Sequence, residues 1–191
     1  MTGFRIVRST RVTEAGFLGV ERVEIADSDD ARHARHVVRH PGAVVVVPVV
    51  ADRSGALLVR QFRAAVGRDL LEIPAGKRDV DGELPEATAA RELEEEVGHS
   101  PGRLVKLAEF FNSPGFCDEY THLFAALDLE DVGAPTPQGA EERAMTIERV
   151  AFVDVDARIA SSDLVDAKSI IGLLLARELL AREQLGRDPF P

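Results

Sequence analysis

The chain has 191 residues, of which 45% are hydrophobic and 29% charged, a balance typical of a soluble globular protein. The length predicts one domain with at most a small appendage, long enough to bury a proper core. The net charge of −10 argues against nucleic acid or an anionic membrane as the partner. Cys117 is the only cysteine, which excludes an internal disulfide and indicates the reducing cytoplasm. We expect a cytoplasmic protein, because the longest apolar run, residues 43–51, is too short to cross a bilayer.

Residues 1–40 show the alternation of polar and apolar side chains that is typical of strands. The alternating segments are residues 4–7, 17–25 and 37–38, and the polar cluster at residues 27–30 supplies a turn. Strands with one apolar face do not readily stand alone. We therefore expect a small N-terminal antiparallel β subdomain, which packs on the chain's own core or on a second subunit.

Residues 41–191 are expected to form the second and larger domain. Ala43 to Ala51 is a valine-rich apolar run, typical of a strand that is buried on both faces. A turn follows at residues 52–55, and residues 56–63 are predicted to be the hairpin partner of that strand. Further strands are predicted at residues 70–74, 104–111, 122–127 and 147–153.

Two helices are predicted among these strands. The second helix covers residues 167–185 and places Ile171, Leu174, Leu175 and Leu179 on one apolar stripe, which indicates core packing. Ile170, Leu173 and Leu180 widen that stripe. Many strands with two helices favour an α/β fold, in which a mixed sheet is sandwiched between helices.

The first helix is predicted to start at Pro85 and to end at Gly98, because proline suits the first helical position and glycine the left-handed C-cap. Glu92, Glu95 and Glu96 lie within an arc of roughly 100° on this helix. Neighbouring carboxylates repel one another, and the C-terminal end of the helix dipole disfavours them. A hard divalent cation such as Mg²⁺ or Mn²⁺ would relieve both penalties.

A solvated acidic face, held by an ion pair from Arg91 to Glu95, is the alternative for such a helix taken alone. The surrounding residues favour the metal site, because their spacing carries a resemblance to a known family. The segment runs as Glu83, seven residues, Arg91-Glu92-Leu93, one residue, Glu95-Glu96, one residue and Gly98.

This spacing, with Gly76 upstream, resembles the signature of the Nudix hydrolases. Six residues (Lys77–Gly82) rather than five separate Gly76 from Glu83, and His99 replaces the usual final aliphatic residue. The register from Glu83 to Gly98 is intact, so the first departure lengthens a loop and the second affects packing.

The resemblance implies an α/β/α sandwich and a metal-dependent hydrolase. It places Mg²⁺ or Mn²⁺, with more than one ion expected, on Glu92 and Glu96. Glu95 and the backbone carbonyl of Ala75 would assist, and Arg91 would hold the acidic face in place.

Four further segments resemble the ADP-ribose pyrophosphatase branch of the family: residues 39–48, 59–63, 71–76, and 113–116 followed by Glu119. This branch implies cleavage of the diphosphate of ADP-ribose to AMP and ribose 5-phosphate. Because arginine suits phosphate recognition, Arg63 is the first candidate for a substrate phosphate and Arg60 the second. Phe116 and Glu119, in a loop that lines the cleft in the family, are candidates for sugar or base contacts.

The general base is expected outside the acidic helix, because carboxylates that bind a metal ion have a lowered proton affinity. The branch takes its base from a late mobile loop. Here the segment from Pro135 to Glu142 is the late loop that ends in paired carboxylates. We expect Glu142, which is nearer the following strand, to be the base. Glu141 is the alternative candidate for the base, and Glu95 is the next candidate after it.

Two other functions and one assembly state follow from the same resemblance. The substrate could instead be another nucleoside diphosphate sugar such as GDP-mannose, since enzymes for those substrates share several of the segments. A non-catalytic ADP-ribose-binding sensor is disfavoured, because all the signature carboxylates are present and no basic recognition helix is seen.

A homodimer formed through residues 1–40 is expected, and twofold dimers are the commonest oligomers.

Overall fold

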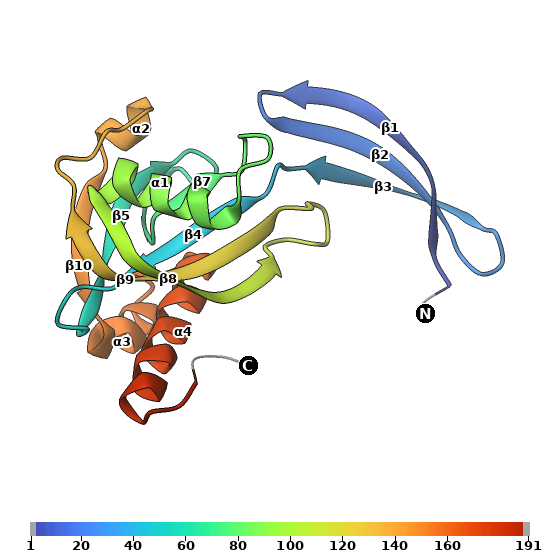
Figure 1. Ribbon diagram of the computed structural model, residues 1–191. Coiled ribbons are helices and arrows are strands. Elements are labelled where there is room, and N and C mark those ends of the chain that lie inside the picture. Colours follow the sequence, from blue (N-terminus) through green and yellow to red (C-terminus); the bar gives the residue numbers. More distant parts are fainter. Residues whose placement is uncertain (1–2, 189–191) are drawn as a thin grey trace. The chain divides into compact units, whose positions relative to one another are not determined.

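The computed structural model describes residues 3–188 (Figure 1). The chain forms two compact units. One contains the residues up to Ala43 together with Phe110–Thr121, and the other contains Val44–Glu109 together with the residues from His122 onward. The division expected after residue 40 did not include the Phe110–Thr121 segment, which returns to the first unit from a distant part of the sequence.

The first unit is an antiparallel sheet of three strands in the order β1-β2-β3 (Figure 1). The strands are β1 (Arg5–Ala15), β2 (Leu18–Ala26) and β3 (Arg32–Arg39). The returning segment attaches to β3, because Val38 N–H donates to the carbonyl of Phe116 (2.7 Å) and Asp118 N–H donates to the carbonyl of Val38 (3.1 Å). β1 is an edge strand that is exposed along its whole length.

The second unit contains the remaining elements in two sheets. One sheet has the order β7-β4-β9-β8, and the other has the antiparallel order β10-β5-β6. The strands are β4 (Ala43–Pro48), β5 (Gly55–Arg63), β6 (Arg68–Glu72), β7 (Ala75–Lys77), β8 (His99–Phe111), β9 (Tyr120–Asp131) and β10 (Thr146–Ala151). The helices are α1 (Pro85–Val97), α2 (Ala140–Arg143), the 3₁₀ turn η1 (Phe152–Asp154), α3 (Val155–Ala160) and α4 (Ala167–Gln184).

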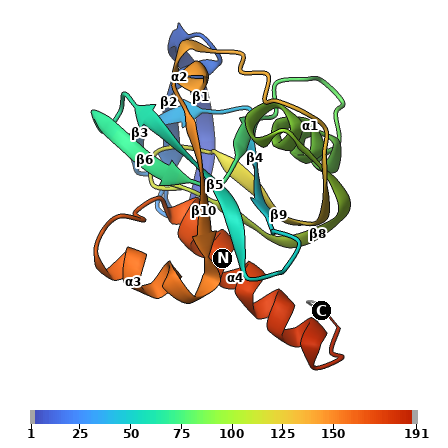
Figure 2. The same ribbon diagram turned by 90° about the vertical axis from the view of Figure 1, so that its left-hand side faces the viewer.

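Helices cover both sides of the β4 strand, as predicted (Figures 1 and 2). Alternate residues of a strand point to opposite faces. Val44 and Val46 pack in one cluster with Leu93 of α1. On the other face Gly172 of α4 approaches Val47 so closely that an added Cβ would lie 3.0 Å from its Cγ2. The expected mixed sheet between helices is confirmed. Within residues 3–188, no helix is long and apolar enough to cross a membrane.

One detail of the predicted second domain is wrong, and another is right only in part. β4 and β5 lie in different sheets, and their hairpin is limited to the bridge between Val49 and Ala56. The predicted apolar stripe of α4 is buried only in part, because Leu173, Leu179 and Leu180 are buried whereas Ile171, Leu174 and Leu175 are only partly buried. The buried face also includes Ser169, Gly172 and Ala176, which were not predicted. Small residues at Gly172 and Ala176 allow the helix to approach the strands closely on that side.

Candidate active site

Helix α1 has the predicted ends. Pro85 begins the helix, and Gly98 adopts the left-handed conformation (φ 68°) as its C-cap. The last turn of α1 is attached to the start of β7, because the Ala75 N–H donates a 3.0 Å hydrogen bond to Oε2 of Glu96. Gly76 lies against Glu92, where an added Cβ would be 1.9 Å from Cδ of the glutamate. Glu92 and Glu96 therefore both meet the backbone of β7, at Gly76 and Ala75.

Arg91 binds three carboxylates of the signature. Its Nη1 lies 2.8 Å from Oε1 of Glu92 and 3.3 Å from Oε2 of Glu95. Its Nη2 lies 3.5 Å from Oε2 of Glu83, which also accepts a 2.8 Å hydrogen bond from Thr88 Oγ1. The acidic face is thus a partly buried network rather than a single exposed pair.

The electrostatics of this face disfavour the ionised carboxylates. Burial raises the pKa of Glu96 to about 8, and the charges of Glu92 and Glu142 add to the rise while Arg63 opposes it. Burial also raises the pKa of Glu92, against the opposing charge of Arg91, and Glu142 again adds to the rise. The carboxylate of Glu142 therefore acts on both residues of the expected metal pair.

The donor chemistry of this cluster fits a hard divalent cation, since buried like-charged carboxylates gain most from one. Glu92 and Glu96 are the two that fit best. Glu95 instead faces Arg91, and Ala75 meets Glu96 through its N–H, whereas the family pattern uses its carbonyl. Among residues 3–188, no three His, Cys, Asp or Glu side chains are arranged closely enough to hold a metal ion as they stand.

Glu142 and Glu141 lie on the short helix α2 and differ in environment. Glu142 is partly buried, and its Oε2 accepts hydrogen bonds from the N–H groups of Gln138 (2.5 Å) and Gly139 (3.2 Å). Glu141 is exposed. These two backbone donors hold Oε2 of Glu142, and within residues 3–188 no hydrogen-bond donor is seen for Oε1.

The segment before α2 is attached to the C-terminal end of α1. Thr136 N–H donates to the carbonyl of Glu95 (2.9 Å), and Val132 N–H donates to the carbonyl of Gly98 (3.0 Å). These bonds satisfy helix carbonyls that have no partner within the helix. The late loop expected to supply the base is therefore placed beside the acidic helix.

The two candidate arginines have different partners. Arg63 donates from Nε and Nη2 to the two carboxylate oxygens of Glu72, at 2.8 and 2.7 Å. Arg60 instead binds Glu148 (3.1 Å) and Asp163 (3.2 Å) through Nη2. Arg63, whose charge acts on Glu96, is thus associated with the acidic cluster, and the contacts of Arg60 belong to another network.

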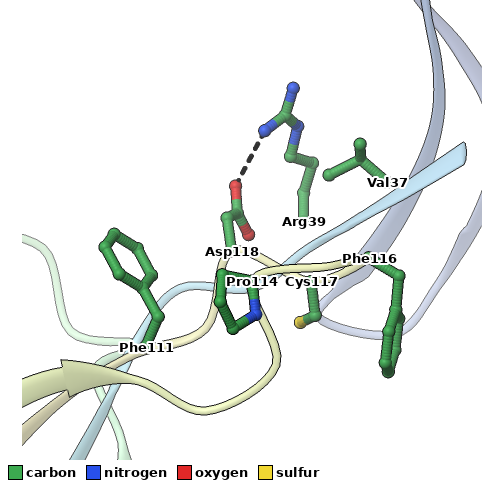
Figure 3. A pocket seen from close by; sticks show the side chains of 7 residues that line it. All are labelled: Val37, Arg39, Phe111, Pro114, Phe116, Cys117 and Asp118. Carbon is green, nitrogen blue, oxygen red and sulfur yellow. Dashed lines mark hydrogen bonds and ion pairs between the residues drawn. The ribbon is translucent and has the colours of Figure 1, made fainter. Parts of the chain in front are cut away.

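Phe116 and Glu119 belong to the first unit. Phe116 is 59% exposed and lines a cavity of about 290 Å³. The other lining residues are Val37, Arg39, Phe111, Pro114, Cys117 and Asp118 (Figure 3). Arg39 donates a 3.0 Å hydrogen bond to Asp118, which also accepts one from the His40 N–H (2.8 Å). Glu119 is partly buried and is not among the lining residues.

Sequence analysis missed Glu72 and the Arg39–Asp118 pair. A signal for Glu72 is present in the sequence, because it is a charged residue between the apolar Leu71 and Ile73 in a predicted strand. The partner of Arg39 could not be inferred, since Asp118 is 79 residues away in the chain.

Comparisons with known proteins agree with this architecture. A family model described as the NUDIX domain matches residues 39–168. An ADP-ribose pyrophosphatase of Bacillus subtilis (strain 168) is 40% identical over 152 residues, which are 80% of this chain and 80% of that protein. Another, from Mycobacterium tuberculosis (strain ATCC 25618 / H37Rv), is 33% identical over 171 residues, 90% of this chain and 82% of that protein.

A solved structure described as an ADP compounds hydrolase has the same fold, with a TM-score of 0.81 at 24% identity and coverage of 97% of both chains. The family match covers the acidic helix, the loop before it and the segment that contains Glu142. The chain therefore belongs to the Nudix hydrolase family.

Proposed function

We propose that this Nudix hydrolase cleaves the diphosphate of ADP-ribose to AMP and ribose 5-phosphate, with Mg²⁺ or Mn²⁺ as the cofactor and more than one ion per site. The main observation in support is the convergence of buried Glu96, Glu92 and the charge of Glu142 at the end of α1. The choice of ADP-ribose is supported by the two relatives, both of them ADP-ribose pyrophosphatases.

Divalent ions at such a site activate water and stabilise the oxygens of the leaving group. Glu92 and Glu96 would hold the ions, with help from Glu95 and the Ala75 carbonyl. Arg91 keeps the face of α1 in position through its bonds to Glu92 and Glu95.

Glu142 is proposed as the general base, because one of its oxygens is held by backbone donors and the other remains available. Arg63 would bind a phosphate oxygen, with Arg60 as the weaker candidate. Phe116 and Glu119 are proposed to contact the sugar or base.

The test is a substrate panel of ADP-ribose, GDP-mannose, NADH, diadenosine polyphosphates and 8-oxo-dGTP, with Mg²⁺ present and the products identified. We expect AMP and ribose 5-phosphate in equal amounts, with the highest kcat/KM for ADP-ribose. A higher value for GDP-mannose would support the alternative sugar nucleotide. Binding of ADP-ribose without turnover would support the sensor.

We also propose a homodimer that forms through the N-terminal β subdomain. β1 is an open edge strand and exposes Ile6 (68%) and Val12 (57%), an arrangement that invites pairing with another chain. Sedimentation at micromolar concentration should give twice the monomer mass, and an active monomer would contradict the proposal.

A cytoplasmic location is proposed from the single cysteine.

A further inference from the structure

Glu72, at the end of β6, is a buried carboxylate that the proposed mechanism does not use. The residue is 1% exposed. A buried charge is costly unless it is paired and hydrogen-bonded. Here both carboxylate oxygens accept parallel hydrogen bonds from Arg63, in the bidentate geometry that combines strength with a defined orientation.

The surroundings of Glu72 hold it in place. The N–H of the next residue, Ile73, donates to Ser169 Oγ (2.9 Å), and Ser169 in turn donates to Asp166 (2.7 Å) at the N-terminus of α4. Lys168 lies 2.5 Å from Asp166 and 4.0 Å from Oε2 of Glu72. The strand end and the helix start therefore form one framework, to which the carboxylate of Glu72 is anchored.

Arg63 retains a free edge. Glu72 takes Nε and Nη2, whereas the described part of the chain supplies no hydrogen-bond partner for Nη1. The Arg63 side chain is 39% exposed, so an anion from solution can reach it. The guanidinium is therefore fixed on one edge and available on the other.

We propose that Glu72 is a positioning residue, which holds Arg63 by its Nε–Nη2 edge so that Nη1 is presented to a diphosphate oxygen of the substrate. This inference rests on the proposed function. A guanidinium that is already oriented loses little side-chain freedom when the phosphate binds, so the contact contributes more to affinity. Without Glu72, Arg63 would have to be ordered by the substrate itself.

The test compares the full-length enzyme with its Glu72→Gln variant, which keeps the size of the side chain and removes its charge. KM and kcat for ADP-ribose are measured, together with the Kd of the non-hydrolysable α,β-methylene analogue by calorimetry in Mg²⁺. We expect KM and Kd to rise about tenfold, the usual worth of a charge-assisted hydrogen bond, with kcat within about threefold of wild type.

A double-mutant cycle separates positioning from packing. In the Arg63→Lys background there is no guanidinium for Glu72 to orient, so adding Glu72→Gln should not weaken binding of the analogue further. The matched control is Glu183→Gln, which removes a carboxylate that binds Arg53 (2.9 Å) and Arg103 (2.8 Å). Glu183 lies near the other end of α4, roughly 20 Å from Ser169 at about 1.5 Å per residue. That variant should bind the analogue like wild type.

An unchanged Kd in Glu72→Gln, with lowered thermal stability alone, would overturn the inference and leave Glu72 a structural residue. An additive loss in the double variant would do the same. If Glu72→Gln does not fold, Glu72→Asp, which keeps the charge and withdraws the carboxylate, should still raise Kd several-fold, and a wild-type Kd there would also overturn it. Failure of the wild-type enzyme to bind the analogue would instead contradict the proposed function.

Discussion

The backbone N–H of Ala75 donates a 3.0 Å hydrogen bond to Oε2 of Glu96, across 21 residues of sequence. The bond joins the last turn of α1 to the start of β7 and places the buried carboxylate beside the backbone of Ala75. It favours the ionised form of Glu96, but burial outweighs it and keeps the pKa high. Glu96 thus has a defined position, and burial favours its neutral form near neutral pH.

The Glu96→Gln variant should lose at least about a hundredfold in turnover while keeping its fold, because the amide preserves size and removes the anionic ligand. The measurement is kcat at saturating Mg²⁺, with circular dichroism as the check on folding. A kcat near that of wild type would contradict the assignment of Glu96 as a metal ligand.

The metal-free protein should become less stable as pH rises from about 5 to about 8. The pKa of Glu96 rises from 4.5 to about 8 on folding, so the stabilising neutral form is fully present below 4.5 and is lost as pH passes 8. The raised pKa of Glu92 acts in the same direction. Thermal unfolding in EDTA should show a Tm that falls with pH more steeply in wild type than in Glu96→Gln. Equal slopes would contradict the assignment.

Binding of Mg²⁺ at pH 7 should release protons, since Glu96 must ionise to serve as a ligand. Calorimetry in two buffers with different ionisation enthalpies measures this release directly. We expect close to one proton per protein in wild type and much less in Glu96→Gln. A wild-type enthalpy that does not depend on the buffer would contradict the expectation.

The Glu142→Gln variant should lose roughly 10²–10⁴-fold in kcat, the usual worth of a positioned acid–base group, with substrate and metal affinity little changed. The kcat of the Glu141→Gln variant, which alters the exposed neighbouring residue, should fall much less. The two kcat values are compared alongside the Kd for Mg²⁺. If both variants turn over normally, the base is to be sought in α1, with Glu95 first.

Replacing Gly76 with alanine should weaken Mg²⁺ binding by tenfold or more without unfolding the protein. The new Cβ would lie 1.9 Å from Cδ of Glu92, and the flexible end of that side chain can move away at small cost to stability. The shift of Tm on titration with Mg²⁺ reports the affinity. A titration curve that overlays the wild-type curve would show that the position of Glu92 does not matter.

Sequence alone determined the elements that depend on neighbouring residues. The ends of α1 at Pro85 and Gly98 follow from local backbone preferences, and the shared face of Glu92, Glu95 and Glu96 follows from helical periodicity. The acidic signature and the family were readable for the same reason, because their spacing lies within one helix and one loop.

Only the tertiary structure decided the features that depend on distant residues. The sequence ranks Arg63 before Arg60 as a phosphate ligand but does not give their partners, and one meets buried Glu72 whereas the other meets Glu148 and Asp163. The separation of β4 from β5, and which residues of the apolar stripe of α4 are fully buried, likewise depend on the strands that lie beside them. Side-chain partners and sheet order are set by packing between segments far apart in the chain, and local sequence patterns contain no record of that packing.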